Sequence, residues 1–334
     1  MTLVYAIIMF CILIFIHEFG HFIVAKACGV KVNEFALGMG PAIFKRQKGE
    51  TLYALRAIPI GGYCAMEGED EESEDERAFN NKKAWQKALI VVAGATMNFI
   101  LCVVIMIGIA TFSGTPTTTV GELTADGPAK AAGLKVGDQI VRIDDKKIDE
   151  WTDITTAIGE GSETVRVGII RDGHEMTITS ETVEEDGRLI IGILPERDHG
   201  VITGIKNGID STGKMTVMMV DTFRMLFTGE VSVKELSGPV GIVYVVNDTA
   251  KMGILYLFYL TALISLNLAI VNMLPLPALD GGRLLMIIIR KITGKAITDE
   301  MEGKIHFIGI MLLFALMIYV TWNDIVRFIV PFFN

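Results

Sequence analysis

The sequence predicts a polytopic α-helical membrane protein with four transmembrane helices, a membrane-associated β-loop and one extracytoplasmic α+β domain. The first observation is composition: 51% of the 334 residues are hydrophobic, and the mean hydropathy is +0.47, more apolar than soluble domains of this size. The second is that four apolar stretches reach the roughly 20 residues needed to cross the hydrocarbon core. These stretches are 3–25, 88–112, 253–274 and 305–330.

Basic residues near the ends of these stretches predict their orientation. Ten Lys and Arg residues fall in 26–87 and five in 281–304, and such residues concentrate on the cytoplasmic side of a membrane. We therefore expect both loops to be cytoplasmic, and the segment 113–252 and both termini to be extracytoplasmic. The N-terminal stretch is too long for a cleaved signal peptide and lacks a basic region before it, so we expect a retained span.

Charge and cysteine content exclude two classes of protein. The chain has 39 acidic and 30 basic residues, a net charge of -9, which argues against nucleic acid as a partner. The acidic run 67–76, EGEDEESEDE, is typical of a solvated loop. None of the four cysteines lies in 113–252 and no CxxC spacing occurs, so no disulfide framework is expected.

The cytoplasmic stretch 31–66 predicts strands rather than a helix. VNEFALGMGPAIF and ETLYALRAIPIGGYCAM are rich in glycine and in alternating residues. Because this stretch directly follows the first span, we expect a sheet packed against the membrane or dipping into it. Irregular backbone at that depth persists only where protein or a water-filled cavity surrounds it.

The segment 113–200 predicts a small domain of short strands and one or two helices. Strand-like runs such as ETVRVGIIRDG are bounded by Gly or Asp turns, and GPAKAAGLKVGDQI fits a short helix that ends at Gly133. The pattern DGPAKAAGLKVGDQIVRIDDKKI, followed by RDGHEMTI, resembles a PDZ domain. PDZ domains bind extended peptides at a sheet edge. A spacer that only restricts access to the membrane is the alternative.

The segment 201–252 is expected to contain an amphipathic helix over Thr203–Thr228, followed by a linker. Within KMTVMMVDTFRMLFTG the polar Thr216, Asp221 and Arg224 lie away from an apolar side. That side consists of Met215, Met218, Met219, Phe223, Leu226 and Phe227. The helix is too short and too polar to span, which favours an interfacial helix over a core helix of the outer domain.

Three titratable residues interrupt the first apolar stretch in the motif HEFGH. A helix places His17 and His21 on one face, one turn apart, where both imidazoles can bind one zinc ion. Glu18 is offset about 100° around the axis and can reach a zinc-bound water as general base. Ionisable groups in a span are costly and are functional by default. Histidines that only hydrogen-bond between helices are the alternative.

A catalytic zinc needs a third protein ligand. His174 and His199 fall in the outer segment, on the wrong side of the membrane, whereas His306 opens the last span and is conceivable. Asp280 is better placed, since Pro275 and Pro277 interrupt the preceding helix near the cytoplasmic edge. The alternative interpretation of LPLPALDGGR is an ordinary turn between span and loop, with a solvated aspartate.

HEFGH in the first span together with NMLPLPALDGG in a later one resembles the site-2 protease family of intramembrane zinc metalloproteases. The family pairs HExxH with NxxPxPxLDG, and every fixed position of the second motif matches here. The matching residues are Asn272, Pro275, Pro277, Leu279, Asp280 and Gly281. With a PDZ-like segment between the second and third spans, the chain is similar to the bacterial type that cleaves an anti-sigma factor, but with one PDZ-like domain instead of two.

The resemblance implies a role for each matching residue. His17, His21 and Asp280 would bind Zn²⁺, and Glu18 would be the general base. Asn272 and Asn267 are similar to membrane asparagines that bind the substrate backbone or the developing oxyanion; for Asn267 an interhelical hydrogen bond is the alternative. The sheet in 31–66 resembles a membrane-associated β-loop that offers its edge to substrate, and LSGPVGI (236–242) resembles a loop before the third span.

The resemblance also implies partners, location and domain organisation. Substrates would be single-span, anti-sigma-factor-like proteins or remnant signal peptides in the bacterial cytoplasmic membrane; the ligand of the PDZ-like domain stays open. We expect the PDZ-like domain and the amphipathic helix to gate access to the site. The expected domains are a catalytic membrane core (1–112 and 253–334), a PDZ-like domain (113–200) and a helix with linker (201–252).

Two other functions are compatible with buried zinc ligands. A scaffold that has lost catalysis is disfavoured by the retained Glu18. A zinc transporter is expected to show polar positions in several spans or an internal repeat, whereas 88–112 contains Asn98 as its notable polar residue. The sequence therefore favours an intramembrane protease.

Overall fold

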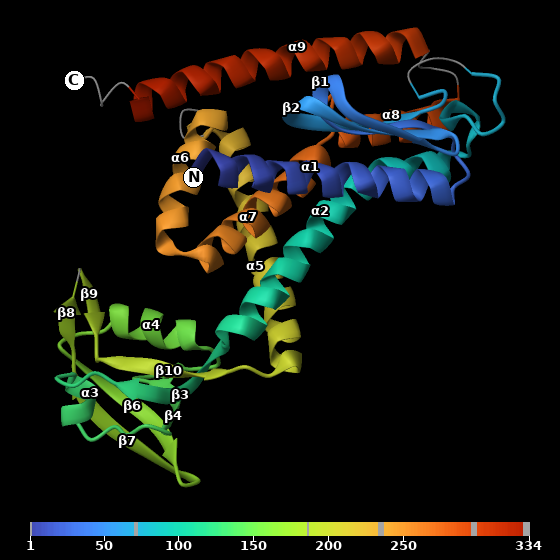
Figure 1. The fold of residues 1–334 in the computed structure, drawn as a ribbon. Coiled ribbons are helices and arrows are strands. Elements are labelled where there is room, and N and C mark those ends of the chain that lie inside the picture. Colours follow the sequence, from blue (N-terminus) through green and yellow to red (C-terminus); the bar gives the residue numbers. More distant parts are fainter. Residues whose placement is uncertain (1, 70–72, 186, 233–236, 295–298, 330–334) are drawn as a thin grey trace. The chain divides into compact units, whose positions relative to one another are not determined.

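The computed structural model describes residues 2–69, 73–185, 187–232, 237–294 and 299–329. The chain divides into two compact units, one formed by 1–106 with 210–334 and the other by 107–209. Figure 1 shows the helices and strands of both units, and each unit is considered by itself.

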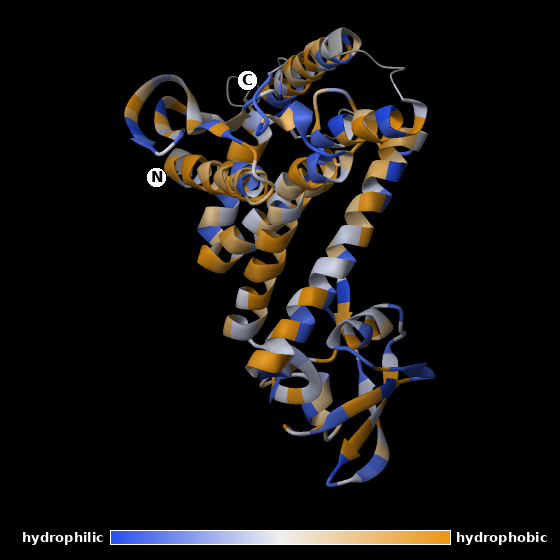
Figure 2. Ribbon diagram, turned by 90° about the vertical axis from the view of Figure 1, so that its right-hand side faces the viewer, coloured by the Kyte–Doolittle hydropathy of each residue, from blue (hydrophilic) through white to orange (hydrophobic). Residues whose placement is uncertain are grey.

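Four helices of the described chain are long and apolar enough to cross a membrane, which confirms the number predicted. Figure 2 shows helices that are hydrophobic along most of their length. Many of their apolar side chains are exposed, as expected where lipid is the solvent. The four candidate spans are Val4–Ala27 in α1 (Thr2–Ala27), Ala84–Ser113 in α2 (Ala84–Ser113), Ile254–Asn272 in α7 (Ile254–Asn272) and Met301–Phe328, which includes α9 (Asp299–Asp324).

Strands β1 (Val32–Lys48) and β2 (Thr51–Met66) form an antiparallel hairpin directly after α1, so the strands expected in 31–66 are present. The end of the hairpin nearest α1 is buried, with Val32 and Phe35 in a core that α1 and α2 complete. The far end exposes large apolar side chains. These exposed residues are Met39, Ile43, Phe44, Leu55 and Ile58. Register shifts occur along β1 from Val32 to Phe44.

Helix α7 ends at Asn272, and a turn over 273–279 leads into α8 (Asp280–Thr293). The two prolines of this turn cannot continue the helix, as the sequence predicted. Gly281 and Gly282 lie against the backbone of the turn, because a Cβ on either would come within 2.4 Å of a carbonyl oxygen. Asp280 therefore opens α8 in a fixed position.

Helix α6 (Pro239–Met252) corrects the expectation of a loop over 236–242 and of a linker before the third span. Residue 236 lies outside the described residues, and Pro239–Ile242 form the first turn of the helix. Pro239 fits the first helical position. The Gly241 N–H donates to the buried carboxylate of Asp324 on α9 at 2.7 Å. That carboxylate comes from 83 residues further along the chain, so no local sequence signal reveals it.

The 107–209 unit contains a mixed α+β domain and parts of two long helices. Its antiparallel sheet has the order β10-β3-β4-β6-β7, with β5 paired to β4, while β8 pairs with β9. A single apolar core includes Val120, Ile140, Ile154 and Val167. The strands are β3 (Thr115–Leu123), β4 (Gln139–Ile143), β5 (Lys146–Lys147), β6 (Thr164–Arg171), β7 (His174–Glu181), β8 (Val183–Glu185), β9 (Arg188–Ile190) and β10 (Ile193–Asp198), and the short helices are α3 (Pro128–Ala131) and α4 (Trp151–Gly159).

Helix α5 (Val201–Thr228) begins two residues before the predicted amphipathic helix and ends at the predicted residue. Its first turns pack closely on α2, because a Cβ on Gly204 would lie 2.1 Å from Thr111 and one on Gly208 2.6 Å from the backbone of Ile107. Glycines four residues apart permit this approach of two helices. Further along, α5 exposes large apolar side chains such as Met218 and Phe227.

Candidate metal centre

His17 and His21 lie one turn apart on α1 and face the same side. Their rings are edge to face, with centroids 4.8 Å apart, and their Nε2 atoms are 3.2 Å apart. His21 is buried and His17 nearly so. Histidines with both Nε2 atoms turned toward one point can donate two lone pairs to a single cation.

Asp280 supplies a third ligand atom from the far end of the sequence. Its Oδ2 lies 3.4 Å from Nε2 of His17 and 3.5 Å from Nε2 of His21. This is the group of His, Cys, Asp and Glu residues that, among the described residues, is arranged to hold a metal ion. Oδ2 is buried and accepts no hydrogen bond from the described part of the chain, although a buried carboxylate oxygen ordinarily finds a partner.

The three atoms fit a tetrahedral zinc site. Zinc bonds to His nitrogen and carboxylate oxygen are about 2.0–2.2 Å long, so ligand atoms at tetrahedral angles lie about 3.3 Å apart. The observed separations are 3.2, 3.4 and 3.5 Å. Two imidazoles and one carboxylate also match the donor set of a catalytic zinc, which leaves one position open for water or substrate.

The groups in contact with Nδ1 of each histidine fix the orientation of both imidazoles. Nδ1 of His21 lies 2.8 Å from the carbonyl oxygen of Ile90, and Nδ1 of His17 lies 3.4 Å from the side-chain amide of Asn98. A histidine that binds metal through Nε2 is protonated at Nδ1 and needs an acceptor there. The Ile90 carbonyl is such an acceptor, and the Asn98 amide becomes one when its oxygen faces His17.

Asn98 is a functional candidate to which the sequence assigned no role. Its side chain is fully buried, and its Oδ1 has no hydrogen-bond partner among the described residues. Its backbone carbonyl accepts a hydrogen bond from Ser265 of α7 at 2.7 Å, which joins two spans beside the histidines. The available signal was a single amide in an apolar span, a feature that marks functional positions.

Two glycines allow α1 and α2 to approach at the site. A Cβ on Gly20, within HEFGH, would lie 2.4 Å from the carbonyl oxygen of Ala93. A Cβ on Gly94 would lie 2.3 Å from Nε2 of His21 and 2.7 Å from Cε1 of His17. Real Cβ atoms do not come this close to other heavy atoms, so the imidazoles occupy space that only glycine leaves.

Glu18 is half-buried beside strand β2. A Cβ on Gly62 of that strand would lie 3.2 Å from Cγ of Glu18 and 3.0 Å from the carbonyl oxygen of Ala36 on β1. The carboxyl group thus emerges from the turn of helix that bears His17, next to the edge of the hairpin. This position suits a base that acts on a group bound between the hairpin and the histidines.

The remaining predicted residues lie outside this group. Asn272 is the last residue of α7 and is half-buried, while Asn267 is exposed, and in the described chain neither makes a polar contact with the histidines or with Asp280. His174 and His199 belong to the 107–209 unit. His306 is on α9, where its Nδ1 accepts a hydrogen bond from the N–H of Ala278 at 2.9 Å.

Comparison with known proteins now adds to this geometry. The model of peptidase family M50 matches residues 5–316, nearly the whole chain and both motifs of the site. The chain belongs to peptidase family M50. This is the site-2 protease family, so the resemblance drawn from HEFGH and NMLPLPALDGG is confirmed.

Curated relatives of this M50 protein are named as zinc metalloproteases. A putative zinc metalloprotease of Clostridium acetobutylicum is 39% identical over 97% of each chain. The regulator of sigma-W protease RasP of Bacillus subtilis is 34% identical over 98% of each chain. The chain is therefore a zinc metalloprotease of the M50 family, which disfavours the scaffold and transport alternatives.

A solved structure also matches part of the chain. It is the PDZ domain of an SdrC-like protein from Listeria monocytogenes, which is 21% identical over 24% of this chain and 87% of its own, with a TM-score of 0.22. That similarity is below the level at which a shared fold follows.

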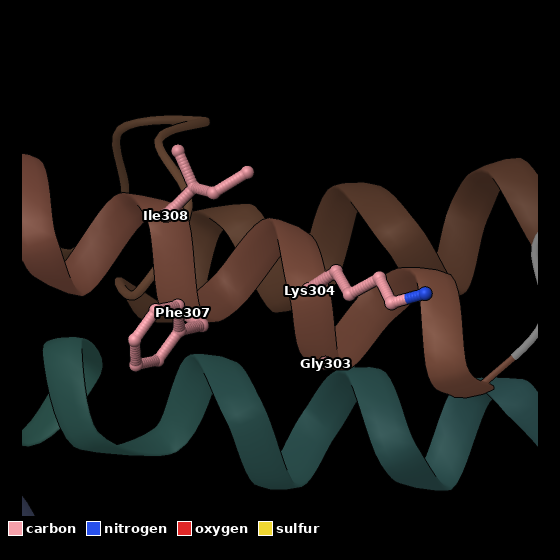
Figure 3. Close-up of a pocket in the computed structure, with 4 residues that line it drawn as sticks. All are labelled: Gly303, Lys304, Phe307 and Ile308. Carbon is pink, nitrogen blue, oxygen red and sulfur yellow. The ribbon is translucent and has the colours of Figure 1, made fainter.

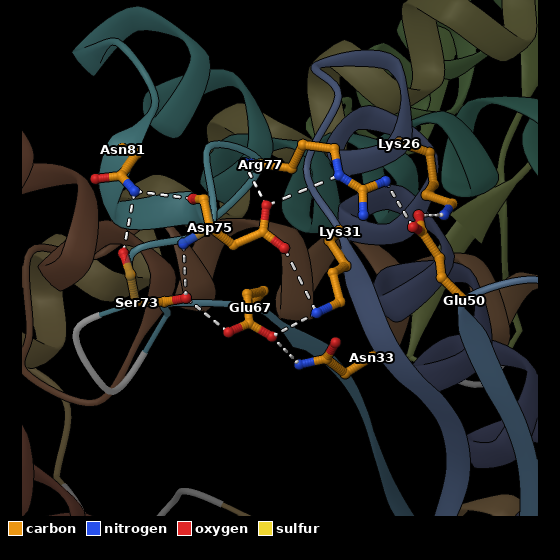
Figure 4. A network of polar contacts seen from close by, with 9 residues as sticks. All are labelled: Lys26, Lys31, Asn33, Glu50, Glu67, Ser73, Asp75, Arg77 and Asn81. Carbon is orange, nitrogen blue, oxygen red and sulfur yellow. Dashed lines mark hydrogen bonds and ion pairs between the residues drawn. The ribbon is translucent and has the colours of Figure 1, made fainter.

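The acidic run of this M50 chain forms a polar network beside the membrane core (Figure 4). Glu67 accepts hydrogen bonds from Ser73 at 2.7 Å, Asn33 at 2.9 Å and Lys31 at 3.2 Å. These bonds, that of Ser73 first, lower the pKa of Glu67 to about 2. The described part of the run is therefore bonded to the start of β1 rather than simply solvated. The predicted solvated loop holds for its exposed members, such as Glu76.

Glu69 connects the same run to α8. Its carboxylate accepts a hydrogen bond from Arg283, three residues after Asp280. Both side chains are largely shielded from solvent. The run thereby reaches the helix that Asp280 opens.

Proposed function

We propose that this zinc metalloprotease is an intramembrane endopeptidase that holds zinc between His17, His21 and Asp280. One observation carries the proposal: three ligand atoms lie within 4.8 Å of one another, where α1 packs against α2, and both of these helices are long and apolar enough to span a bilayer. A metal site in that setting acts on peptide bonds that enter the membrane. The substrate class is therefore single-span membrane proteins, anti-sigma-factor-like proteins or remnant signal peptides.

Glu18 is proposed as the general base and then the general acid. A zinc ion held by His17, His21 and Asp280 would supply a Lewis acid, which would lower the pKa of a bound water toward about 7 and polarise the scissile carbonyl. The Glu18 carboxylate takes the proton of the attacking water and then gives it to the nitrogen of the departing amine. Asn98 and the Ile90 carbonyl hold the two imidazoles in the orientation that binds metal through Nε2.

Asn272 and Asn267 are proposed to bind the substrate backbone or the developing oxyanion. Support comes from the position of Asn272 in the motif that ends at Asp280, and from the suitability of an amide N–H in a dry site for that task. Both residues lie on the last turns of α7, so their amides belong to the helix that leads into the Asp280 turn.

The β1–β2 hairpin is proposed to receive the substrate as an added strand. A helical peptide must unwind before its carbonyl can be attacked, and an exposed strand edge offers hydrogen bonds to unwound backbone. The apolar end of the hairpin, which includes Ile43 and Phe44, suits contact with lipid. The position of Glu18 beside β2 would bring such a strand to the base.

The outer segment is proposed to be a single PDZ-like domain over 113–200 that, with the amphipathic helix, gates access from the extracytoplasmic face. Support comes from the antiparallel sheet and short helices of 107–209, from the basic residues of loops 26–87 and 281–304, and from the printed name of the sigma-W relative. The setting would be the bacterial cytoplasmic membrane. Deletion of 117–195 is expected to broaden the range of substrates that are cleaved. Unchanged selectivity would refute the proposed gating role.

The decisive experiment compares purified wild-type protein with Glu18→Gln on a single-span model substrate in detergent. Gln keeps the size of the side chain and leaves the zinc ligands in place, so it removes only the base. We expect cleavage by the wild type alone, its loss with a zinc chelator, and equal zinc content in both proteins. Equal cleavage by both proteins would refute the role of Glu18.

A further inference from the structure

The turn before Asp280 contains a strained residue. Ala278, two positions before Asp280, has φ 76°, a left-handed conformation that is costly for a residue with a Cβ. Such strain persists where the surrounding structure holds the residue in place.

His306 of α9 provides the first restraint. Its Nδ1 accepts a hydrogen bond from the backbone N–H of Ala278 at 2.9 Å, across 28 residues of sequence. This N–H lies outside both flanking helices and has no helical acceptor. His306 is itself a polar residue in an apolar span, where such residues ordinarily have a function.

Gly309 provides the second restraint. A Cβ at Gly309 would lie 2.4 Å from Cβ of Pro277 and 2.7 Å from its carbonyl oxygen. The backbone of α9 therefore touches the turn directly, one helical turn beyond His306. Gly281 and Gly282 press on the same turn from α8, where a Cβ would come within 2.4 Å of carbonyl oxygens.

One face of α9 thus packs against the turn. Residues three apart lie on the same side of a helix, which groups His306 with Gly309. A shallow pocket on α9 is lined by Gly303, Lys304, Phe307 and Ile308 (Figure 3). Helical geometry puts Ile308 of this pocket on the side of α9 opposite to His306. The Ile308 side chain is 58% exposed, so that face offers a control position.

We infer that His306 is a positioning residue for the metal centre: its hydrogen bond to Ala278 holds the strained turn that presents Asp280 to the two histidines. The inference rests on the proposed role of Asp280 as a zinc ligand. His306 is considered in the sequence as a ligand, but its Nδ1 is occupied by the turn. It acts on the centre through Asp280 and does not touch the reacting atoms.

The test measures zinc affinity of the purified full-length protein by competition with a chromogenic chelator, independently of cleavage. We expect His306→Leu to bind zinc about 10–100-fold more weakly, the range found when a hydrogen bond that orients a metal ligand is lost. His306→Asn retains an acceptor at the place of Nδ1 and should stay within about threefold of wild type. His306→Gln moves its acceptor one bond outward and should behave like His306→Leu. Ile308→Ala should match wild type.

Two further measurements separate positioning from general damage. The visible spectrum of the cobalt-substituted protein reports ligand geometry, and it should change in His306→Leu but not in His306→Asn. Addition of Ala278→Gly to His306→Leu should restore part of the zinc affinity, because glycine adopts the left-handed conformation without strain.

The outcomes distinguish this inference from the proposed function. Wild-type zinc affinity in Asp280→Asn would overturn the proposed ligand set itself. Loss of zinc in Asp280→Asn with wild-type affinity in His306→Leu would overturn only the role of His306. If His306→Leu does not fold, the other two variants decide the role of His306. Equal zinc affinities of His306→Asn and His306→Gln would overturn that role, and at least tenfold tighter binding by His306→Asn would support it.

Discussion

Gly94 of α2 lies directly against His21 of α1, so close that a Cβ on the glycine would be 2.3 Å from Nε2 of the imidazole. The space for the two imidazoles of the proposed centre therefore depends on a residue without a side chain in a different helix. HEFGH alone does not make the site; it needs a neighbouring helix with a gap at this level.

Gly94→Ala is expected to displace His21 and lower the zinc content of the purified protein at least tenfold, since imidazole and methyl group cannot occupy the same space. Zinc per protein is measured by atomic absorption after dialysis. Gly108→Ala, in the same helix, is the matched control. A Cβ at Gly108 would meet no atom of the described chain within 4 Å. Full zinc content in Gly94→Ala would contradict the packing described.

Asn98→Leu is expected to weaken zinc binding by about 10–100-fold, because it removes the side-chain amide that contacts Nδ1 of His17. The side chain is similar in size and suits an apolar span, so the helix should persist. Chelator competition gives the affinity. Thr96→Val is the control, since the Thr96 hydroxyl donates a hydrogen bond to the carbonyl oxygen of Val92 in its own helix. Equal affinities for both variants would show that His17 does not need Asn98.

Glu67→Gln is expected to destabilise the packing around the start of β1 at neutral pH but not at low pH. The folded pKa of Glu67, about 2, lies below its ordinary 4.5, so its contribution is fully present above pH 4.5 and is lost as pH falls toward 2. The measurement is the difference in Tm between wild type and variant from pH 7 to pH 3. Glu76→Gln, at an exposed position of the same run, is the control. A difference that grows on acidification would reverse the assigned sign.

Asp324→Ala is expected to lower the free energy of unfolding by about 1–2 kcal/mol, the usual effect of removing a buried acceptor that caps a helix. The buried carboxylate receives the Gly241 N–H, and Gly238 and Gly241 leave space for it. Asp324→Asn keeps one acceptor oxygen and should lose less. Thermal unfolding in detergent measures the order of stability of wild type, Asp324→Asn and Asp324→Ala. Asp248→Ala, at a half-exposed aspartate of α6, should have little effect.

The sequence contained most of what defines the candidate centre. His17 and His21 are four residues apart, so helical geometry alone aligns them, and the prolines before Asp280 mark where a helix must end. The four apolar helices follow from composition in the same way. These features depend on residues close together in the chain.

Features that depend on distant contacts were missed or misjudged. Asn98 was visible as a polar residue in a span, but its partner His17 is 81 positions away. The sequence predicts a linker where α6 lies. The carboxylate that caps this helix belongs to Asp324, 83 residues further along the chain, so no neighbouring residue reveals the helix. His306 was considered as a ligand because histidines bind zinc, whereas the fold gives its Nδ1 to Ala278. Local patterns cannot specify which residue meets which across the bundle.

The distance along the chain between the proposed ligands also has a consequence for biosynthesis. About 260 residues separate His21 from Asp280, and ribosomes add about 5–20 residues per second, so the third ligand emerges roughly 13–50 s after the first two. During that interval the nascent chain contains only two of the three proposed ligands. With the proposed ligand set, translation order acts as a propeptide would, because the centre cannot be completed until nearly all of the chain has been made.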